Sequence, residues 1–423
     1  FDTGRAAPAE FRVVRKSDGS VTTRRRSRVA RHLRWAVVAL LVSGCGPSSD
    51  ADRASDPGGW VVGPEPRVSV GGYGDDPAYL LNGVVGATLL RDGRLAILDR
   101  GSAELRYFDS DGHHVRSVAG SGDGPGELRF PMQLVRLPAD SLMVLGVRSG
   151  MTWFDPSGDY VRSRRVNWFE IGGQSCRIGE GNTWGLPDGS VLVVLEDNFS
   201  PRGCPPQPEG VWRQSGLIGL QRWDPAPRFD TLAILPASER NGDNYRVFGL
   251  SLLTATHANR LYAGDTGADI TVLGLDGRSH GSIASPHPRR PVPTAARQQR
   301  EQQWTREDGS IAYGAAFDYP ESYPSYAQLV VDAHGSLWVK EYPEVRDPLS
   351  SWRLASVYGG FVQEGGARWA VVDSNGIVLQ RLRTPAGLFV LEIGHDYVLG
   401  VARDELGVET VHVYGLNRGS GSF

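Results

Sequence analysis

SVAGSGDGPGEL, residues 117–128, decides the fold, because the chain contains a second copy of it. The stretch SVGGYGDDPAYL, residues 69–80, lies forty-eight residues earlier and matches it at seven of twelve positions. A Gly-rich loop of this kind can hold a phosphate when a helix N-terminus follows it. Here RFPMQLVRLP follows, with two prolines and no helical period. Self-similarity at a fixed spacing is typical of repeat folds, so we interpret the stretch as part of a repeating unit.

From Trp60 onward, short strand-like runs alternate with turn signals. A turn after the first strand, A, of each unit is expected at Asp92-Gly93, Ala139-Asp140, Asp188-Gly189, Ala258-Asn259, His334-Gly335 and His395-Asp396. A second turn follows the third strand, as in YFDSDG (107–112), where Asp caps the turn and Gly supplies a positive φ. Four strands, A to D, repeated six times predict an all-β, six-bladed β-propeller with four-stranded antiparallel blades.

The last unit supplies a test of this count, because it lacks a fourth strand. Its strands are expected at 388–393, 397–402 and 408–414, after which the chain ends. RVSVG, residues 67–71, is in register with the fourth strand of the first unit. We therefore predict that this N-terminal strand closes the last blade and covers its open edge.

Three segments of the chain resemble bacterial six-bladed β-propeller proteins related to NHL-repeat propellers. They are the opening stretch, GSAELRYFDSDG (101–112) and GHDYVLGVARDELGVETVHVY (394–414). Many members of this family are lipoproteins of unknown role. The resemblance implies a fold and a compartment but little biochemistry, since a fold does not determine a function.

The N-terminal region has the pattern of a targeting segment. RRRSRVARHLR (24–34) is basic, and WAVVALLV (35–42) is apolar but too short for the roughly 20 residues that span a bilayer. VSGC, which ends at Cys45, resembles a bacterial lipobox, which implies lipid attachment at Cys45. Ordinary secretion with a free Cys45 is the alternative. We expect an exported, lipid-anchored protein of the cell envelope, at the periplasmic side of a membrane or the outer membrane.

The predicted organisation has four parts. They are a signal peptide over 1–45 with a possible spurious upstream extension, a flexible tether over 46–59, the propeller over 60–416 and a tail over 417–423. The net charge of -3 combines a basic N-terminus with an acidic body. An acidic body argues against nucleic acid as a partner, because phosphate binding needs a basic face. A monomer is expected.

Two cysteines flank the A–B hairpin of the third blade. Cys176 lies twelve residues before Asp188, and Cys204 lies sixteen residues after it. Since exported proteins meet oxidising conditions, we predict a disulfide. The alternatives are two free thiols or a metal site, for which nearby histidines at zinc spacing are lacking.

Three insertions break the repeat, at 201–216, 286–324 and 341–366. The B–C and D–A connections of a propeller open on one face, so the insertions are predicted to meet over one mouth. Residues 294–307 are predicted to form a helix capped by Thr294. Aromatic side chains in these insertions suit a binding surface, and the alternative is a small satellite core beneath the loops: Trp304, Tyr323, Tyr342 and Trp352.

Acidic residues end the second strand, B, of five units. They are Asp99, Glu196-Asp197, Asp265, Glu341 and Asp404, with Arg100, Arg148 and Arg403 as candidate partners. Such a ring could hold calcium, which favours carboxylate oxygens, or a cationic ligand. In the alternative interpretation each acid caps its own turn. We include Asp99, Arg100, Asp265 and Glu341 with the four aromatic residues as candidate ligand-binding residues. No cofactor is predicted, with calcium left open.

Catalytic signals in the sequence are weak. His334 and His395 are expected in A–B turns, His113-His114 at an outer strand, and these histidines are not expected to converge. No G-x-S-x-G motif is present. The predicted function is a membrane-tethered platform that binds a protein, peptide or carbohydrate. One alternative is a lactonase-like metal-dependent hydrolase or lyase using the acidic ring, and another is a structural subunit of an envelope complex.

Overall fold

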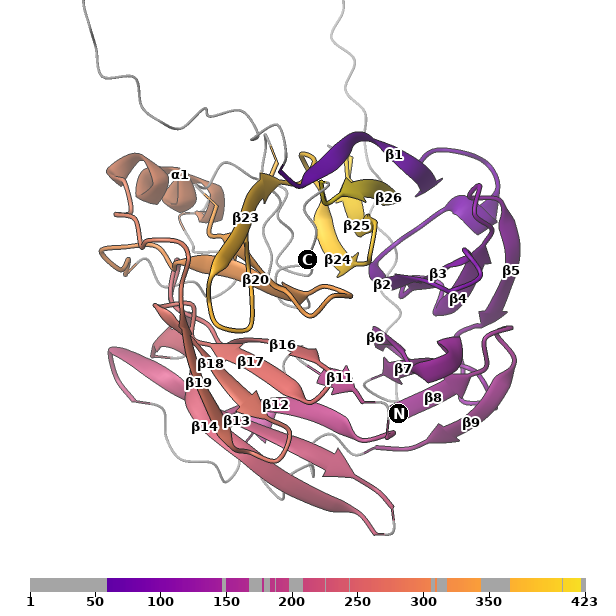
Figure 1. The fold of residues 1–423 in the computed structure, drawn as a ribbon, viewed down its shortest axis with the longest axis horizontal. Coiled ribbons are helices and arrows are strands. Elements are labelled where there is room, and N and C mark those ends of the chain that lie inside the picture. The colour runs from indigo at the N-terminus through magenta and orange to yellow at the C-terminus, as the bar shows by residue number, and fades with distance from the viewer. Residues whose placement is uncertain are drawn as a thin grey trace, which may run out of the picture. The chain divides into compact units, whose positions relative to one another are not determined.

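The computed structural model describes most of the chain from residue 59 onward. The described residues are 59–146, 150–166, 177–178, 183–186, 188–197, 208–224, 226–242, 244–305, 309, 318–343, 366–404 and 406–419. They all belong to one compact unit, Ala54–Phe423. Within that unit the described strands form six antiparallel sheets, which are the blades of a propeller (Figure 1). The predicted fold class is confirmed.

Four blades are simple meanders whose strands follow one another in chain order. Their strands are β2 (Val84–Leu89), β3 (Leu95–Asp99), β4 (Glu104–Phe108) and β5 (His114–Ala119) in blade 1; β6 (Pro131–Arg136), β7 (Leu142–Gly146), β8 (Gly150–Phe154) and β9 (Tyr160–Arg164) in blade 2; β16 (Leu253–His257), β17 (Arg260–Gly264), β18 (Asp269–Gly274) and β19 (Ser279–Ala284) in blade 4; and β20 (Tyr326–Val331), β21 (Leu337–Glu341), β22 (Arg368–Val372) and β23 (Val378–Arg383) in blade 5. The opening stretch is therefore the end of β5 and the crossover to β6, as predicted.

Blade 3 departs from this plan. Its strands are β10 (Arg177–Ile178), β11 (Thr183–Gly185), β12 (Val191–Asp197), β13 (Val211–Arg222), β14 (Arg228–Asn241) and β15 (Asn244–Tyr245). The prediction that residues 201–216 form one insertion was wrong in its second half, because 211–216 belong to β13. Pairing from Val211 opposite Asn241 onward extends the β13–β14 ladder and satisfies these backbone groups.

Blade 6 joins the two ends of the described chain. It consists of β24 (Phe389–Ile393), β25 (Tyr397–Arg403), β26 (Glu409–Asn417) and β1 (Val61–Gly71). β1 pairs antiparallel with β26, so that Val70 lies opposite Val411 and Val61 opposite Asn417 (Figure 1). The predicted closure by the N-terminal strand is confirmed.

The hydrophobic core is divided among the contacts between blades. A separate buried cluster lies between each pair of neighbouring blades. Trp338 and Trp369 lie in the cluster between blades 5 and 6. Val70, Val84 and Phe389 lie in the one between blades 6 and 1. Because this last cluster exists, the ring is closed by side-chain packing as well as by strand pairing.

The crossover from β1 to β2 contains a short 3₁₀ turn, η2 (Pro77–Tyr79), held by a buried arginine. One guanidinium nitrogen of Arg106 donates to the carbonyls of Pro77, Ala78 and Leu80 at 3.1, 3.2 and 2.7 Å. Arg106 is 4% exposed. A charged hydrogen-bond donor of this kind satisfies the carbonyls of an irregular segment that has no sheet partners.

Two faces of the ring are distinguished by their connections. We call the face with the A–B and C–D turns the turn face, and the face with the B–C and D–A connections the insertion face. The described parts of the second and third insertions do meet on the insertion face, where Val292, Tyr323 and Tyr342 share one buried cluster.

The second insertion contains the single α-helix of the described residues, α1 (Thr294–Trp304). A helix was predicted here, but the prediction that Thr294 caps it was wrong. Pro293 is the N-cap, with φ −66° and ψ 149°, and Thr294 is the first helical residue. Proline has φ fixed near this value, so it sets the entry to the helix without a side-chain hydrogen bond.

Ring closure can be tested by removing the strand that provides it. Deleting residues 60–71 is expected to lower the melting temperature sharply, because the edge of β26 and the blade 6–blade 1 cluster become exposed. In a finer test, Val70→Ala removes part of a fully buried side chain and should cost about 2 kcal/mol in unfolding free energy. Val61→Ala, on a side chain that is 44% exposed, is the control. Equal stabilities of the two variants would refute this account of closure.

Candidate functional site

Asp99, one of the acidic residues at the ends of the B strands, is engaged by its own turn. Asp99 is 1% exposed. Its carboxylate accepts hydrogen bonds from Asn82 N at 3.1 Å, Gly101 N at 3.2 Å and Ser102 Oγ at 3.0 Å. Burial raises its pKa, although these hydrogen bonds oppose the shift. Asp99 therefore supports the loop after β3 in the way that the capping interpretation describes.

Other acids of the predicted ring are held by backbone amides or by arginines. Asp265 accepts from Gly267 N at 2.8 Å and lies 3.1 Å from a guanidinium nitrogen of Arg213. Glu341 forms ion pairs with Arg290, at 3.4 Å, and with Arg368. Charges paired in this way have fewer free oxygens for a metal ion.

Asp404 shows the same capping function with a further partner. Its carboxylate accepts from Leu406 N at 3.0 Å and Val408 N at 2.9 Å, and from the hydroxyl of Tyr73. The hydrogen bond from Tyr73 and those from the turn backbone lower the pKa of Asp404. The predicted partner Arg100 is half-buried, and its backbone N donates to Gly83 O at 3.0 Å.

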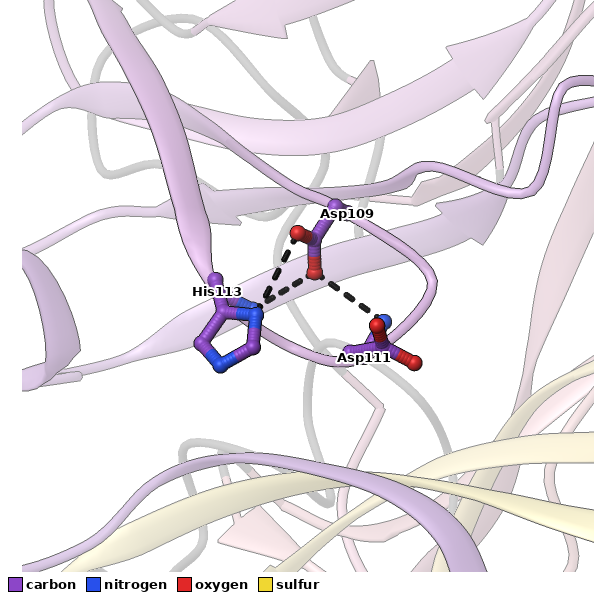
Figure 2. Close-up of side chains that lie close together, drawn as sticks. All are labelled: Asp109, Asp111 and His113. Carbon is purple, nitrogen blue, oxygen red and sulfur yellow. Dashed lines mark hydrogen bonds and ion pairs between the residues drawn. The ribbon is translucent and has the colours of Figure 1, made fainter.

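Within the described residues, one cluster has three groups that could hold a metal ion: Asp109, Asp111 and His113 (Figure 2). It lies on the turn face, outside the predicted ring. Asp109 Oδ1 accepts from Asp111 N at 3.0 Å and His113 N at 2.8 Å, and Oδ2 lies 3.3 Å from His113 Nδ1. Gly112 completes the turn with φ 86°.

The same turn recurs elsewhere in the ring. Aspartates with an oxygen that accepts from the backbone N atoms two and four residues later are Asp109, Asp155, Asp332, Asp373 and Asp404. The aspartate side chain stabilises the turn, as predicted. The Asp109 cluster is one copy of this structural element, so it is no evidence for a metal centre.

Of the four aromatic residues predicted to bind a ligand, two are buried and two have side chains outside the described part of the structure. Tyr323 is 1% exposed and Tyr342 is 7% exposed. Their rings stack at 5.6 Å, and Phe248 meets Tyr323 edge-on at 5.0 Å. These side chains form the satellite core of the alternative interpretation, not an exposed surface. Trp304 ends α1, but its side chain lies outside the described part of the structure, as do Trp352, Cys45, Cys176 and Cys204.

A cavity of about 440 Å³ opens between blades 3 and 4 on the insertion face. Leu235 and Pro236 of β14 form one wall. Small residues of blade 4 leave space opposite them, and Asp265, Asp269 and Arg289 provide charges of both signs. The lining of the cavity is therefore mixed, with more apolar than polar surface.

The central strands carry a polar network that the sequence analysis missed. Glu392 of β24 accepts hydrogen bonds from Thr88 Oγ1 of β2 at 2.5 Å and from the hydroxyl of Tyr397. Arg136 of β6 lies 3.9 Å from it. The network thus connects blades 6, 1 and 2. In the sequence, the one sign of this network is a carboxylate inside the apolar run FVLEI (389–393) of a predicted inner strand.

Burial raises the pKa of Glu392, against the opposing effect of its hydrogen bonds and of Arg136. A carboxyl group that keeps its proton to higher pH can donate it as a general acid. Both oxygens already accept hydrogen bonds from the protein, however, so the structural role of joining three blades is the one that the contacts support.

Lys340 of β21 has a chemically unusual environment. Burial lowers its pKa to about 8. A lysine amine with a lowered pKa is a candidate nucleophile, but the side chain is 0% exposed. A substrate cannot reach the amine in this conformation, so it is not assigned to the site.

The prediction that the histidines do not converge was wrong for one pair. His334, in the turn between β20 and β21, and His395, in the turn between β24 and β25, were not expected to converge. His395 Nδ1 lies 3.2 Å from His334 Nε2. The ring order explains the contact, since the A–B turns of blades 5 and 6 are neighbours on the turn face.

No family model matches the sequence, and no curated protein matches it. Solved structures do match. A protein described as exported, from Bacteroides fragilis, is 12% identical over 85% of this chain and 96% of that chain, with a TM-score of 0.45. A DUF4221 member from Bacteroides vulgatus is 9% identical over 86% and 100%, at 0.47. A gluconolactonase from Xanthomonas campestris is 14% identical over 80% and 86%, at 0.38. At these values the comparisons do not bear on function.

The Glu392 network makes the stability of the propeller depend on pH. Because the folded-state pKa is raised, the folded protein keeps this proton to a higher pH than the unfolded chain, whose value is near 4.5. The contribution of Glu392 to unfolding free energy should therefore fall as pH rises from about 4.5, by about 1.4 kcal/mol for each unit of the shift. Glu392→Gln should remove this fall in urea denaturation measured from pH 4 to 7.

The control for this experiment is Glu65→Gln, a change at an exposed side chain. Its pH profile should run parallel to that of the unchanged protein, because both retain Glu392. A parallel profile for Glu392→Gln would show that Glu392 has the same pKa in the folded and unfolded protein.

Proposed function

We propose that the protein is an exported, membrane-tethered β-propeller that binds a partner of the cell envelope through its insertion face. The observation that carries the proposal is the aromatic core beneath the insertions. Its three buried rings come from three different connections: Phe248 from the link between blades 3 and 4, Tyr323 from the second insertion and Tyr342 from the start of the third.

Ordering these long connections costs conformational entropy, although the propeller fold itself does not need them. Each loop residue that is ordered loses about 1–2 kcal/mol of conformational entropy, and a propeller needs only short links between blades. The shared core offsets this cost, together with the Arg290–Glu341 ion pair and the hydrogen bond from Arg246 Nε to Asp318 O at 3.0 Å. Long loops held on a rigid scaffold are typical of binding surfaces.

The cavity beside this core supports a ligand with both apolar and polar groups. Apolar surface from Leu235, Pro236 and small residues of blade 4 lies beside the charged side chains of Asp269 and Arg289, while Asp265 is paired with Arg213. Hydroxyl, amide and charged groups of a peptide, a protein loop or a carbohydrate can pair with such a lining. The described acids do not form a three-ligand metal cluster at this face, so we do not propose the lactonase-like alternative.

The tether is the second part of the proposal and rests on the sequence. VSGC resembles a lipobox, and its Cys45 lies outside the described residues. Among the described residues no helix is long and apolar enough to cross a membrane. We propose that a lipid on Cys45 holds the propeller at the membrane. The membership in NHL-related propellers, the monomeric state and the lack of nucleic-acid binding remain predictions.

The binding face can be tested by photo-crosslinking in cells. A photoreactive amino acid at Gln298, an exposed position of α1, should give a discrete crosslinked adduct. The same amino acid at Asn375, exposed in a C–D turn on the opposite face, is the matched control. Adducts from Asn375 and none from Gln298 would assign binding to the wrong face and overturn the proposal.

Lipid attachment is tested separately by fractionation. Cys45→Ala should move the protein from the membrane fraction to the soluble fraction, because a lipobox cysteine has no substitute as acceptor. Ser48→Ala, in the predicted tether, should leave the protein in the membrane fraction. Retention of the Cys45→Ala variant in membranes would contradict the lipoprotein assignment without affecting the binding face.

A further inference from the structure

His334 and His395 form a close side-chain pair on the turn face. The two rings are perpendicular, with centroids 4.7 Å apart. Nδ1 of His395 and Nε2 of His334 are separated by 3.2 Å. Both residues are exposed, so the pair is open to solvent and makes no contribution to a buried core.

This separation is the one that two imidazole ligands have around a common metal ion. Zinc–nitrogen bonds of about 2.0–2.1 Å at a tetrahedral angle place two ligand nitrogens about 3.3–3.4 Å apart. A hydrogen bond between two neutral rings also accounts for 3.2 Å. The side chains therefore need little movement to exchange that hydrogen bond for two bonds to a metal.

The backbone of the two turns is fixed in register. Ala333 N donates to Ile393 O at 3.1 Å, which joins the turn of blade 5 to the inner strand of blade 6. Arg418 makes a second connection. It donates to Asp332 Oδ2 at 2.9 Å on one side, and to His395 O at 2.9 Å and Gly394 O at 3.0 Å on the other.

Asp332 secures the His334 side of this connection. Its side chain is fully buried, and its carboxylate also accepts from His334 N and from the Trp338 indole, both at 2.9 Å. These contacts fix the backbone from which both imidazoles project, which lowers the entropic cost of bringing the two rings to one metal.

The charges around the pair do not oppose a cation. Asp332 is paired with Arg418 at 2.9 Å, and Asp396, next to His395, is paired with Arg67 at 2.7 Å. These two ion pairs are each neutral overall. A dication at the imidazole nitrogens therefore meets balanced charge from the described neighbours on both turns.

We propose that His334 Nε2 and His395 Nδ1 bind one transition-metal dication of the class that favours imidazole, namely Zn²⁺, Ni²⁺ or Cu²⁺. Water completes the coordination in the isolated protein, and those positions are open to a further ligand. The site lies on the face opposite the insertions, so it is independent of the proposed partner-binding face.

A third histidine offers a matched control. His257 occupies the A–B turn of blade 4 and is exposed. Its ring lies against Gly335, the residue after His334: Nε2 is 3.5 Å from where a Cβ on Gly335 would sit. It is not part of a three-ligand group within the described residues. The histidine content and the general surface of a His257→Ala variant thus match those of the test variants.

The experiment is calorimetric titration of Zn²⁺ and Ni²⁺ into the full chain, produced without a polyhistidine tag. The unchanged protein should bind one equivalent of Ni²⁺. His334→Ala and His395→Ala should each weaken this binding by at least tenfold, while His257→Ala should leave it unchanged. Thermal unfolding with and without metal gives a second readout, because a ligand of the folded state raises the melting temperature.

Two controls keep the result decisive. Melting curves in EDTA show whether each variant folds, and His334→Gln and His395→Gln replace any alanine variant that does not. Failure of the unchanged protein to bind Ni²⁺ or Zn²⁺ below about 1 mM, a Kd that corresponds to roughly 4 kcal/mol, would overturn the proposal. Binding that survives both substitutions, or that His257→Ala weakens equally, would overturn it as well.

Discussion

The antiparallel pairing of β1 with β26 is the interaction on which the remaining structure depends. Every other described sheet is built from one continuous segment, whereas blade 6 takes its outer strand from the opposite end of the chain. Without β1, the edge of β26 would present unpaired backbone groups, and Val70 would be lost from the cluster between blades 6 and 1. Since the buried clusters of the described residues lie between neighbouring blades, opening one contact exposes the side chains of that cluster and allows the ring to distort.

Closure of the ring also determines which side chains can meet. Residues at the same position in neighbouring blades become neighbours in space, although 61 residues separate His334 from His395. Short A–B turns leave such pairs exposed on the turn face. The longer B–C and D–A connections bring Phe248, Tyr323 and Tyr342 together on the insertion face. The same topology therefore creates two different faces. The insertion face carries ordered loops, and the turn face carries an exposed histidine pair.

The architecture could be predicted because the turns carry local chemistry. An Asp that caps a turn and a Gly with positive φ are visible in the sequence, and the alignment of Ser69-Val70 with Ser117-Val118 was enough to predict closure. Contacts between blades were not visible. The His334–His395 contact and the Thr88–Glu392 hydrogen bond depend on the relative rotation of whole sheets. The start of β13 at Val211 was missed because its pairing with β14 overrides the Gly and Pro signals nearby.

The acids of the predicted ring have a structural role that a repeat fold creates at several equivalent positions. A strand that ends at the rim leaves the amides of the following turn without sheet partners, and a carboxylate is a strong acceptor for them. An acid can therefore recur at this position in several blades for a structural reason, as Asp99, Asp265 and Asp404 show. Features that occur once have no such explanation. The loop core around Tyr323 and the network of Glu392 interrupt the repeat. His334 and His395 lie in equivalent turns of neighbouring blades, but their side-chain contact is particular to this pair. These contacts are where this chain differs from a bare propeller.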